Sequence, residues 1–193
     1  KGRDAKRLSL FYRSSGKLLV HYLIPSRPAY TFVDRTLQLC YTTKQPLNFW
    51  RKIMIRIFQA GDLDAVMSIW LNANIEAHHF VDPEYWRSCY DTVKAMIPQA
   101  EVYVAEDDRG INGFIGIAGD YIAGIFVDSS ARTGGIGSQL LDHAKENRQK
   151  LSLSVYKKNV TAVSFYRNRG FQIDAEGVDP QTSESEYTMS WNR

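Results

Sequence analysis

The chain has 193 residues, enough for one domain with a substantial core but too few for two ordinary domains. Hydrophobic residues make up 44% and charged residues 23%, as in globular proteins, and no apolar run approaches the roughly 18 residues of a membrane span. Cys40 and Cys89 lie far apart and only four histidines accompany them, so neither a disulfide framework nor a metal site is expected. These features favour a reducing, cytoplasmic setting and argue against a membrane partner.

The formal net charge of +3 combines two parts of opposite sign. Residues 1–53 hold 11 Lys and Arg against 2 Asp, whereas residues 54–193 hold 13 Lys and Arg against 19 Asp and Glu. This asymmetry predicts a basic N-terminal extension, 1–53, attached to an acidic folded domain, 54–193. Within the extension, 17–24 and 36–41 have the pattern of short strands. The extension is either native or upstream sequence that precedes a native start at Met54, and both interpretations stay open.

Two helices are predicted after the first strand of the domain. The strand covers 54–58, and apolar residues then recur at helical spacing over 61–74. A second helix is predicted over 81–98, because Asp82 can cap its first turn and Pro83 suits the position that follows.

Strands and helices alternate through the rest of the domain. The sequence Asp-Asp-Arg-Gly at 107–110 predicts a hairpin turn, and Gly170 is placed to end the last helix. Strands are expected at 101–107, 111–119, 121–127, 151–156, 171–177 and 186–192, and helices over 137–150 and 159–170. The order predicts a mixed sheet with helices on both faces, of the α/β or α+β class.

The stretch VDSSARTGGIGSQLL, residues 127–141, joins a strand to a helix through a glycine-rich loop. The first N–H groups of such a helix lack internal partners and form an anion site. Gly135 and Gly137 would let a phosphate oxygen approach the main chain, and Arg132 would add a positive charge. The Walker pattern fails because Ser138 and Gln139 follow Gly137 where Lys and then Ser or Thr are required. The dinucleotide pattern fails because Ser-Gln-Leu follows Gly137, without a third glycine. Taken alone, the loop suits a pyrophosphate or is a connection without a ligand.

Two motifs in register give the loop a context. Arg-Thr-Gly-Gly-Ile-Gly at 132–137 matches the R/Q-x-x-G-x-G/A signature of the GCN5-related N-acetyltransferase (GNAT) superfamily, and NVTAVSFYRNRGF at 159–171 resembles its second motif, N-x-x-A-x-x-F-Y-x-x-x-G-F. The resemblance covers about residues 54–193. The segments HHFVDPEYW and MSW look most like small bacterial acetyltransferases of the YiaC/YjaB type. The resemblance implies the GNAT fold, with a mostly antiparallel sheet and splayed strands that form an acetyl-CoA cleft.

The same resemblance implies acetyl-CoA as the donor, with no metal, and assigns residues to it. Asn159 matches the position whose side chain bonds the pantetheine arm, and Tyr166 matches the general-acid position. The arm would pair with the strand edge at Ile125, Phe126 and Val127, and the pyrophosphate would sit on the main-chain N–H groups of Arg132, Thr133, Gly134, Gly135, Ile136, Gly137 and Ser138.

Amide formation from a thioester requires proton transfers. A lysine amine has a pKa of about 10.4 and an α-amine one of about 7.7–8, so most acceptors must lose a proton. The phenol of Tyr166 can lend a proton to the departing thiolate; the alternative is a packed aromatic residue beside Phe165. The base is left open.

Candidates for the base come from two places. Many relatives place a Glu where this chain has Tyr121, with Asp120 beside it, so direct carboxylate catalysis is in doubt. His78 and His79 could instead line the acceptor pocket or be surface loop residues. A thiol relay through Cys89 is the weaker interpretation, because a buried helix thiol explains that residue.

The sequence therefore predicts an acetyl-CoA-dependent N-acetyltransferase. It would act by direct attack of a primary amine, on a protein lysine, a protein N-terminus or a small molecule, in a ternary complex. One alternative is a noncatalytic acyl-CoA-binding sensor, although binding alone needs no phenol at Tyr166. Another is an RNA-directed acetyltransferase that uses residues 1–53, although the acidic domain makes nucleic acid an unfavourable partner. The sequence does not decide between a monomer and a homodimer.

Overall fold

A computed structural model describes residues 53–193. The two strands expected upstream lie outside the described residues, so the division of the chain at residue 53 stays a prediction. From Met54 onward the expected order of strands and helices is confirmed, with ends that move by a few residues and three added 3-10 turns. The strands are β1 Met54–Ile57, β2 Glu101–Asp107, β3 Gly110–Ala118, β4 Tyr121–Val127, β5 Lys150–Tyr156, β6 Gln172–Val178 and β7 Ser185–Asn192. The helices are α2 Leu63–Ala77, α3 Pro83–Met96, α4 Ile136–Glu146 and α5 Val160–Asn168, with 3-10 turns η1 Ala60–Asp62, η2 Ile97–Gln99 and η3 Ser129–Gly134.

The strands form one seven-stranded sheet in the order β1-β2-β3-β4-β5-β7-β6. Every neighbouring pair is antiparallel except β4 and β5, which run parallel. These two strands share a single residue pair, Tyr121 with Ser152, and the Ser152 N–H donates to the Asp120 carbonyl at 2.8 Å. β4 and β5 therefore meet at their starts and do not pair further along, which confirms the expected mixed sheet with splayed central strands.

A β-bulge bends β4 where the splay begins. Ile117 of β3 pairs with Ile122, but the next residue pair along is Gly116 with Gly124, so Ala123 is the extra residue. Such a bulge kinks its strand and increases its twist. The kink turns the second half of β4 relative to its start, which contributes to the separation from β5.

Gly124 beside the bulge allows close packing of an aromatic ring. A Cβ on Gly124 would lie 2.0 Å from the Cε2 atom of Phe126, so a larger residue would displace the Phe126 ring. The Phe126 ring lies over this glycine and stacks on Phe114 of β3, with ring centroids 4.8 Å apart. This packing holds the second half of β4, which no longer pairs with β5, against β3.

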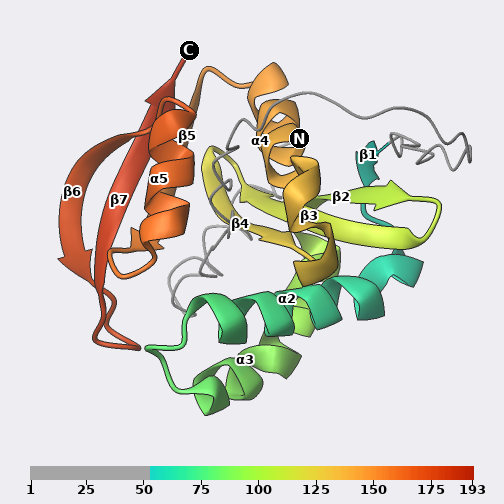
Figure 1. Cartoon of the computed structure of the whole chain (residues 1–193), viewed down its shortest axis with the longest axis horizontal. Helices are drawn as coiled ribbons and strands as arrows, with labels where there is room; N and C mark the ends of the chain where they lie inside the picture. The colour runs from blue at the N-terminus through green and yellow to red at the C-terminus, as the bar shows by residue number, and fades with distance from the viewer. Residues whose placement is uncertain (1–52) are drawn as a thin grey trace, which may run out of the picture.

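Helices cover both faces of the sheet, and each face has its own core cluster (Figure 1). The first cluster packs α4 and α5 on the sheet and includes Leu140, Phe165 and Tyr166. The second packs α2 and α3 on the other face and includes Trp86 and Tyr156. No helix between residues 53 and 193 combines the length and the apolar character needed to cross a membrane.

Candidate active site

The edge of β4 that faces β5 has main-chain groups available for a ligand. Asp128 donates its N–H to the Asn112 carbonyl at 2.8 Å, so Asp128 is paired with the β3 side. In an antiparallel ladder the main-chain N–H and C=O groups of successive residues point alternately toward the partner strand and away from it. The main-chain groups of Phe126 therefore also point toward β3, while those of Ile125 and Val127 point toward β5. The ladder between β4 and β5 does not reach these two residues. Of the three predicted edge residues, Ile125 and Val127 therefore present their main-chain groups to the gap.

The loop after β4 ends at the start of α4, as the anion-site hypothesis requires. The Asp128 carboxylate accepts hydrogen bonds from the Ser130 N–H at 2.9 Å and from its hydroxyl at 2.6 Å, which begins η3. Gly135 then adopts a left-handed conformation with φ of 71°, a region that favours glycine. α4 begins at Ile136, and its first N–H groups, through Ser138, have no carbonyl one turn earlier within the helix. They provide the positive end of the helix dipole at the loop.

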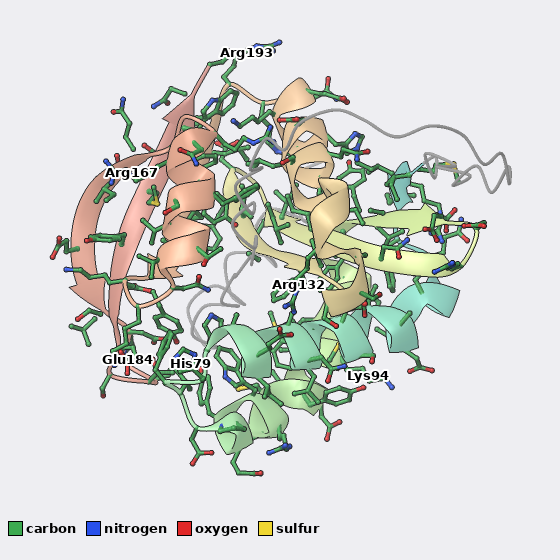
Figure 2. All side chains as sticks on the ribbon, viewed as in Figure 1. His79, Lys94, Arg132, Arg167, Glu184 and Arg193 are labelled. Carbon is green, nitrogen blue, oxygen red and sulfur yellow. The ribbon has the colours of Figure 1, made fainter. Side chains whose placement is uncertain are left out.

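Arg132 is already paired with a carboxylate. Both of its terminal nitrogens donate to the carboxylate oxygens of Glu76 in the last turn of α2, and Figure 2 shows Arg132 between α4 and α2. The hydrogen bonds from Arg132 lower the pKa of Glu76, so the pair is charged at neutral pH. Sequence reasoning missed Glu76, because an exposed acidic residue on a helix carries no local signal of a distant partner.

Asn159 has one side-chain atom in use and one available. Its carboxamide oxygen accepts from the Ala162 N–H at 2.9 Å and caps α5. The residue is 4% exposed, and its amide nitrogen has no hydrogen-bond partner among residues 53–193. A buried amide donor without a partner is costly unless a ligand or water accepts from it. Asn159 therefore fits the predicted contact to an amide carbonyl of the pantetheine arm.

Tyr166 is completely buried on α5, and its hydroxyl has no hydrogen-bond partner in the described part of the chain. Its ring packs against Phe165 and Phe171, with centroids 5.1 and 5.4 Å away. Burial raises the pKa of Tyr166 well above its usual value, and Tyr121 contributes in the same direction. The phenol is therefore protonated at neutral pH and has a free donor. The packed-aromatic interpretation describes its ring but does not account for its hydroxyl.

His78 is buried in an aromatic cluster. Its ring centroid lies 5.0 Å from Trp86, 5.3 Å from Tyr156 and 5.6 Å from Phe80. Burial lowers the pKa of His78 well below its usual value, with a further contribution from His79, so its imidazole is neutral at pH 7. His79 is exposed, as expected for a surface loop residue. The role of His78 as a proton acceptor stays a prediction.

Asp120 and Cys89 lie in less enclosed places. The Asp120 carboxylate is 51% exposed and lies 3.4 Å from the Lys150 ammonium, at the closed end of the gap between β4 and β5. Cys89 is a free thiol, half-buried on α3. A proton-accepting role for Asp120 also stays a prediction.

A polar network beside His78 was not foreseen from the sequence. The Tyr156 hydroxyl donates to the Asp179 carboxylate at 2.7 Å and lies 2.9 Å from the Thr182 hydroxyl. The Gln181 N–H donates to Asp179 at 3.0 Å, and the Tyr85 hydroxyl donates to the Gln181 side chain at 2.5 Å. The network holds the β6–β7 loop against the end of β5 and the start of α3. Nothing local in the sequence pairs a strand tyrosine with an aspartate in a later loop.

The features beside the gap between β4 and β5 fit coenzyme A. The edge of β4 beyond its single pair with β5 can bond amide groups, and the start of α4 can hold phosphates. Asn159 and Tyr166 at α5 add two buried donors that have no partner in the part of the chain that the structure describes. Across residues 53–193, no three His, Cys, Asp or Glu side chains gather as metal ligands would.

Comparison with known proteins identifies the family. The acetyltransferase (GNAT) domain matches residues 98–173. The peptidyl-lysine N-acetyltransferase YiaC of Escherichia coli is 34% identical over 140 residues, which cover 72% of this chain and 96% of YiaC. The chain belongs to the GNAT acetyltransferase family. The resemblance drawn from the two sequence motifs is therefore confirmed, and with it the prediction that the protein is an acetyltransferase.

Solved GNAT structures share the fold. The apo form of YjaB from Escherichia coli superposes with a TM-score of 0.66 at 26% identity, covering 72% of this chain and 97% of YjaB. The PaiA N-acetyltransferase of Thermoplasma acidophilum, solved in complex with coenzyme A, has a TM-score of 0.62 at 20% identity and covers 74% of this chain and 99% of PaiA.

Proposed function

We propose that this GNAT protein transfers the acetyl group of acetyl-CoA to lysine side chains of proteins. The observation that carries the proposal is the Tyr166 hydroxyl in the second GNAT motif, a buried, protonated donor that has no partner among residues 53–193. The name of YiaC, a peptidyl-lysine N-acetyltransferase, supports the lysine acceptor. The complex of PaiA with coenzyme A supports the donor.

The donor would bind along the gap between β4 and β5. Main-chain groups of Ile125 and Val127 would pair with the amides of the pantetheine arm, and the Asn159 amide nitrogen would donate to one of its carbonyls. The N–H groups from Arg132 to Ser138 would hold the pyrophosphate at the start of α4. When bound, the thioester supplies the acetyl group, and its sulfur leaves as a thiolate that needs a proton.

The chain's own residues would move the protons. Tyr166 holds a proton on its hydroxyl at neutral pH and can deliver it to the departing sulfur. The acceptor lysine must arrive neutral, and desolvation near the aromatic cluster of His78 would favour loss of its proton. His78 is neutral at pH 7 and can accept a proton, but burial lowers its pKa and makes it a weak base, whereas Asp120 is exposed; we leave the acceptor proton between these two residues.

The test is acetylation of peptides with one acceptor each: an internal lysine, a free N-terminus, or a small amine. Thiol release would be measured with wild-type protein and with Tyr166→Phe, and the product mapped by mass spectrometry. We expect lysine acetylation by the wild type and strongly reduced release by the variant. Acetylation of the N-terminal amine alone would contradict the lysine acceptor. Binding of acetyl-CoA with no turnover of any amine would instead support the sensor alternative.

A further inference from the structure

The side chain of Arg132 ties the loop between β4 and α4 to α2. Arg132, in the middle of η3, donates from two nitrogens to both carboxylate oxygens of Glu76. This planar two-point contact is the strongest arrangement that arginine and carboxylate make. The side chain of Arg132 is 12% exposed and that of Glu76 is 48% exposed, so the contact is shielded on the loop side and open to solvent on the helix side.

Glu76 is poorly placed for the stability of its own helix. It lies in the last turn of α2, which contains no basic residue, and the helix dipole disfavours an acidic side chain there. The hydrogen bonds from Arg132 lower the pKa of Glu76 and outweigh the opposing effects of burial and of nearby Asp128. The negative charge of Glu76 is thus balanced by Arg132 of the loop and not by a residue in the last turn of α2.

The pairing also changes what Arg132 can offer to an anion. Two of its donors are in use, and its charge is balanced by Glu76. The rest of the loop is shaped by the turn at Asp128 and the left-handed Gly135. Anion binding by the loop would then rest on its main-chain N–H groups.

We propose that Glu76 is a positioning residue for the coenzyme A site. Through Arg132 it holds the loop in the shape that points main-chain N–H groups at the pyrophosphate, so Arg132 serves the ligand by its position more than by its charge. This inference rests on the proposed function, because it takes coenzyme A as the ligand of the loop.

Calorimetric titration with coenzyme A tests the inference on wild-type protein, Glu76→Gln, Arg132→Gln and the double variant. We expect Glu76→Gln to weaken binding on the order of tenfold, since a charged two-point contact is lost. The double variant should bind within about twofold of the weaker single variant, because the two residues act as one unit. The control is Glu84→Gln, which removes an exposed carboxylate paired with Arg87 at 2.5 Å on α3 and should bind as the wild type does.

Three outcomes would overturn the inference. Unchanged binding by Glu76→Gln would show that the pair has no role, and tighter binding would show that Glu76 competes with phosphate for Arg132. Losses that add in the double variant would show that Arg132 contacts the ligand independently. If the wild type itself fails to bind coenzyme A, the proposed function fails, whereas equal binding by wild type and Glu76→Gln contradicts this inference alone.

Hydrogen exchange of the ligand-free protein supplies a readout that a general loss of stability would not reproduce. In Glu76→Gln, the amides of residues 129–135 should exchange faster, while those of the central strands keep wild-type rates. Uniformly faster exchange would contradict a local role and indicate global destabilisation. Unchanged exchange in the loop would contradict positioning by Glu76.

Discussion

Tyr156 at the end of β5 and Tyr166 on α5 are both completely buried, and burial raises the pKa of each. Their hydroxyls differ. That of Tyr156 donates to Asp179 at 2.7 Å, on the α2 and α3 side of the sheet. That of Tyr166 has no partner among residues 53–193, on the α4 and α5 side. Burial and the direction of the pKa shift are therefore alike for the two phenols, and the hydrogen-bond partner is what distinguishes them.

The largest effect is expected on turnover by Tyr166→Phe. Removing the donor should lower kcat by about a hundredfold or more, because a general acid contributes at least about that factor to the rate. The affinity for acetyl-CoA should change by less than about twofold. Because the lost hydroxyl has no partner within the described residues 53–193, the free energy of unfolding should stay equal or rise slightly. Steady-state kinetics and urea denaturation measure the two effects. Equal turnover by the two proteins would remove Tyr166 from the acid role.

Tyr156→Phe should show the opposite balance. It removes the donor to the Asp179 carboxylate and leaves a buried acceptor less satisfied, so the free energy of unfolding should fall by about 1.5–3 kcal/mol. Turnover at a temperature where the variant is folded should fall by less than tenfold. Urea denaturation beside the same kinetic assay gives both values. A hundredfold loss of turnover with unchanged stability would make Tyr156 the functional phenol and reverse the comparison.

Asn159→Asp tests whether the other buried donor without a partner among residues 53–193, the Asn159 amide nitrogen, contacts the ligand. Aspartate caps a helix as well as asparagine does, so the bond to the Ala162 N–H and the stability of α5 should persist. The variant lacks the amide donor, and we expect coenzyme A to bind on the order of tenfold more weakly. Calorimetry measures the affinity, and thermal unfolding is the control for the cap. Unchanged affinity would mean that the partnerless amide nitrogen does not contact the ligand.

Local signals explain why most of the fold could be predicted. Asp82 caps α3 by accepting the Glu84 N–H at 2.9 Å, as its place before Pro83 indicated. The hairpin at 107–110 forms between Asp107 and Gly110, and Gly170 follows α5 with φ of 86°. Each of these depends on neighbouring residues only, so one sequence contains the required information.

The two motifs located Arg132, Asn159 and Tyr166, but the partners of those residues were beyond sequence reasoning. Glu76 and Arg132 are separated by 56 positions and meet only because α2 and α4 both pack on the central strands. The burial of His78 has the same origin, since Trp86 of α3 and Tyr156 of β5 enclose it together with Phe80 of its own turn. Contacts of this kind are consequences of tertiary packing and leave no periodicity or spacing in the sequence.

The smallest effect is expected from His78→Phe and concerns pH. Because burial holds the pKa of His78 below its unfolded value of about 6.5, only the unfolded chain takes up a proton as the pH falls below 6.5. Wild-type stability should therefore fall with decreasing pH in that window, by at most about 1.4 kcal/mol per pH unit from this residue. Phenylalanine suits the aromatic surroundings and cannot titrate, so the variant should lose less stability than the wild type between pH 7 and pH 5.5 when both are unfolded in urea. Identical losses would mean that His78 is protonated in the folded protein, and an accompanying large loss of turnover would support His78 as the proton acceptor rather than as part of the core.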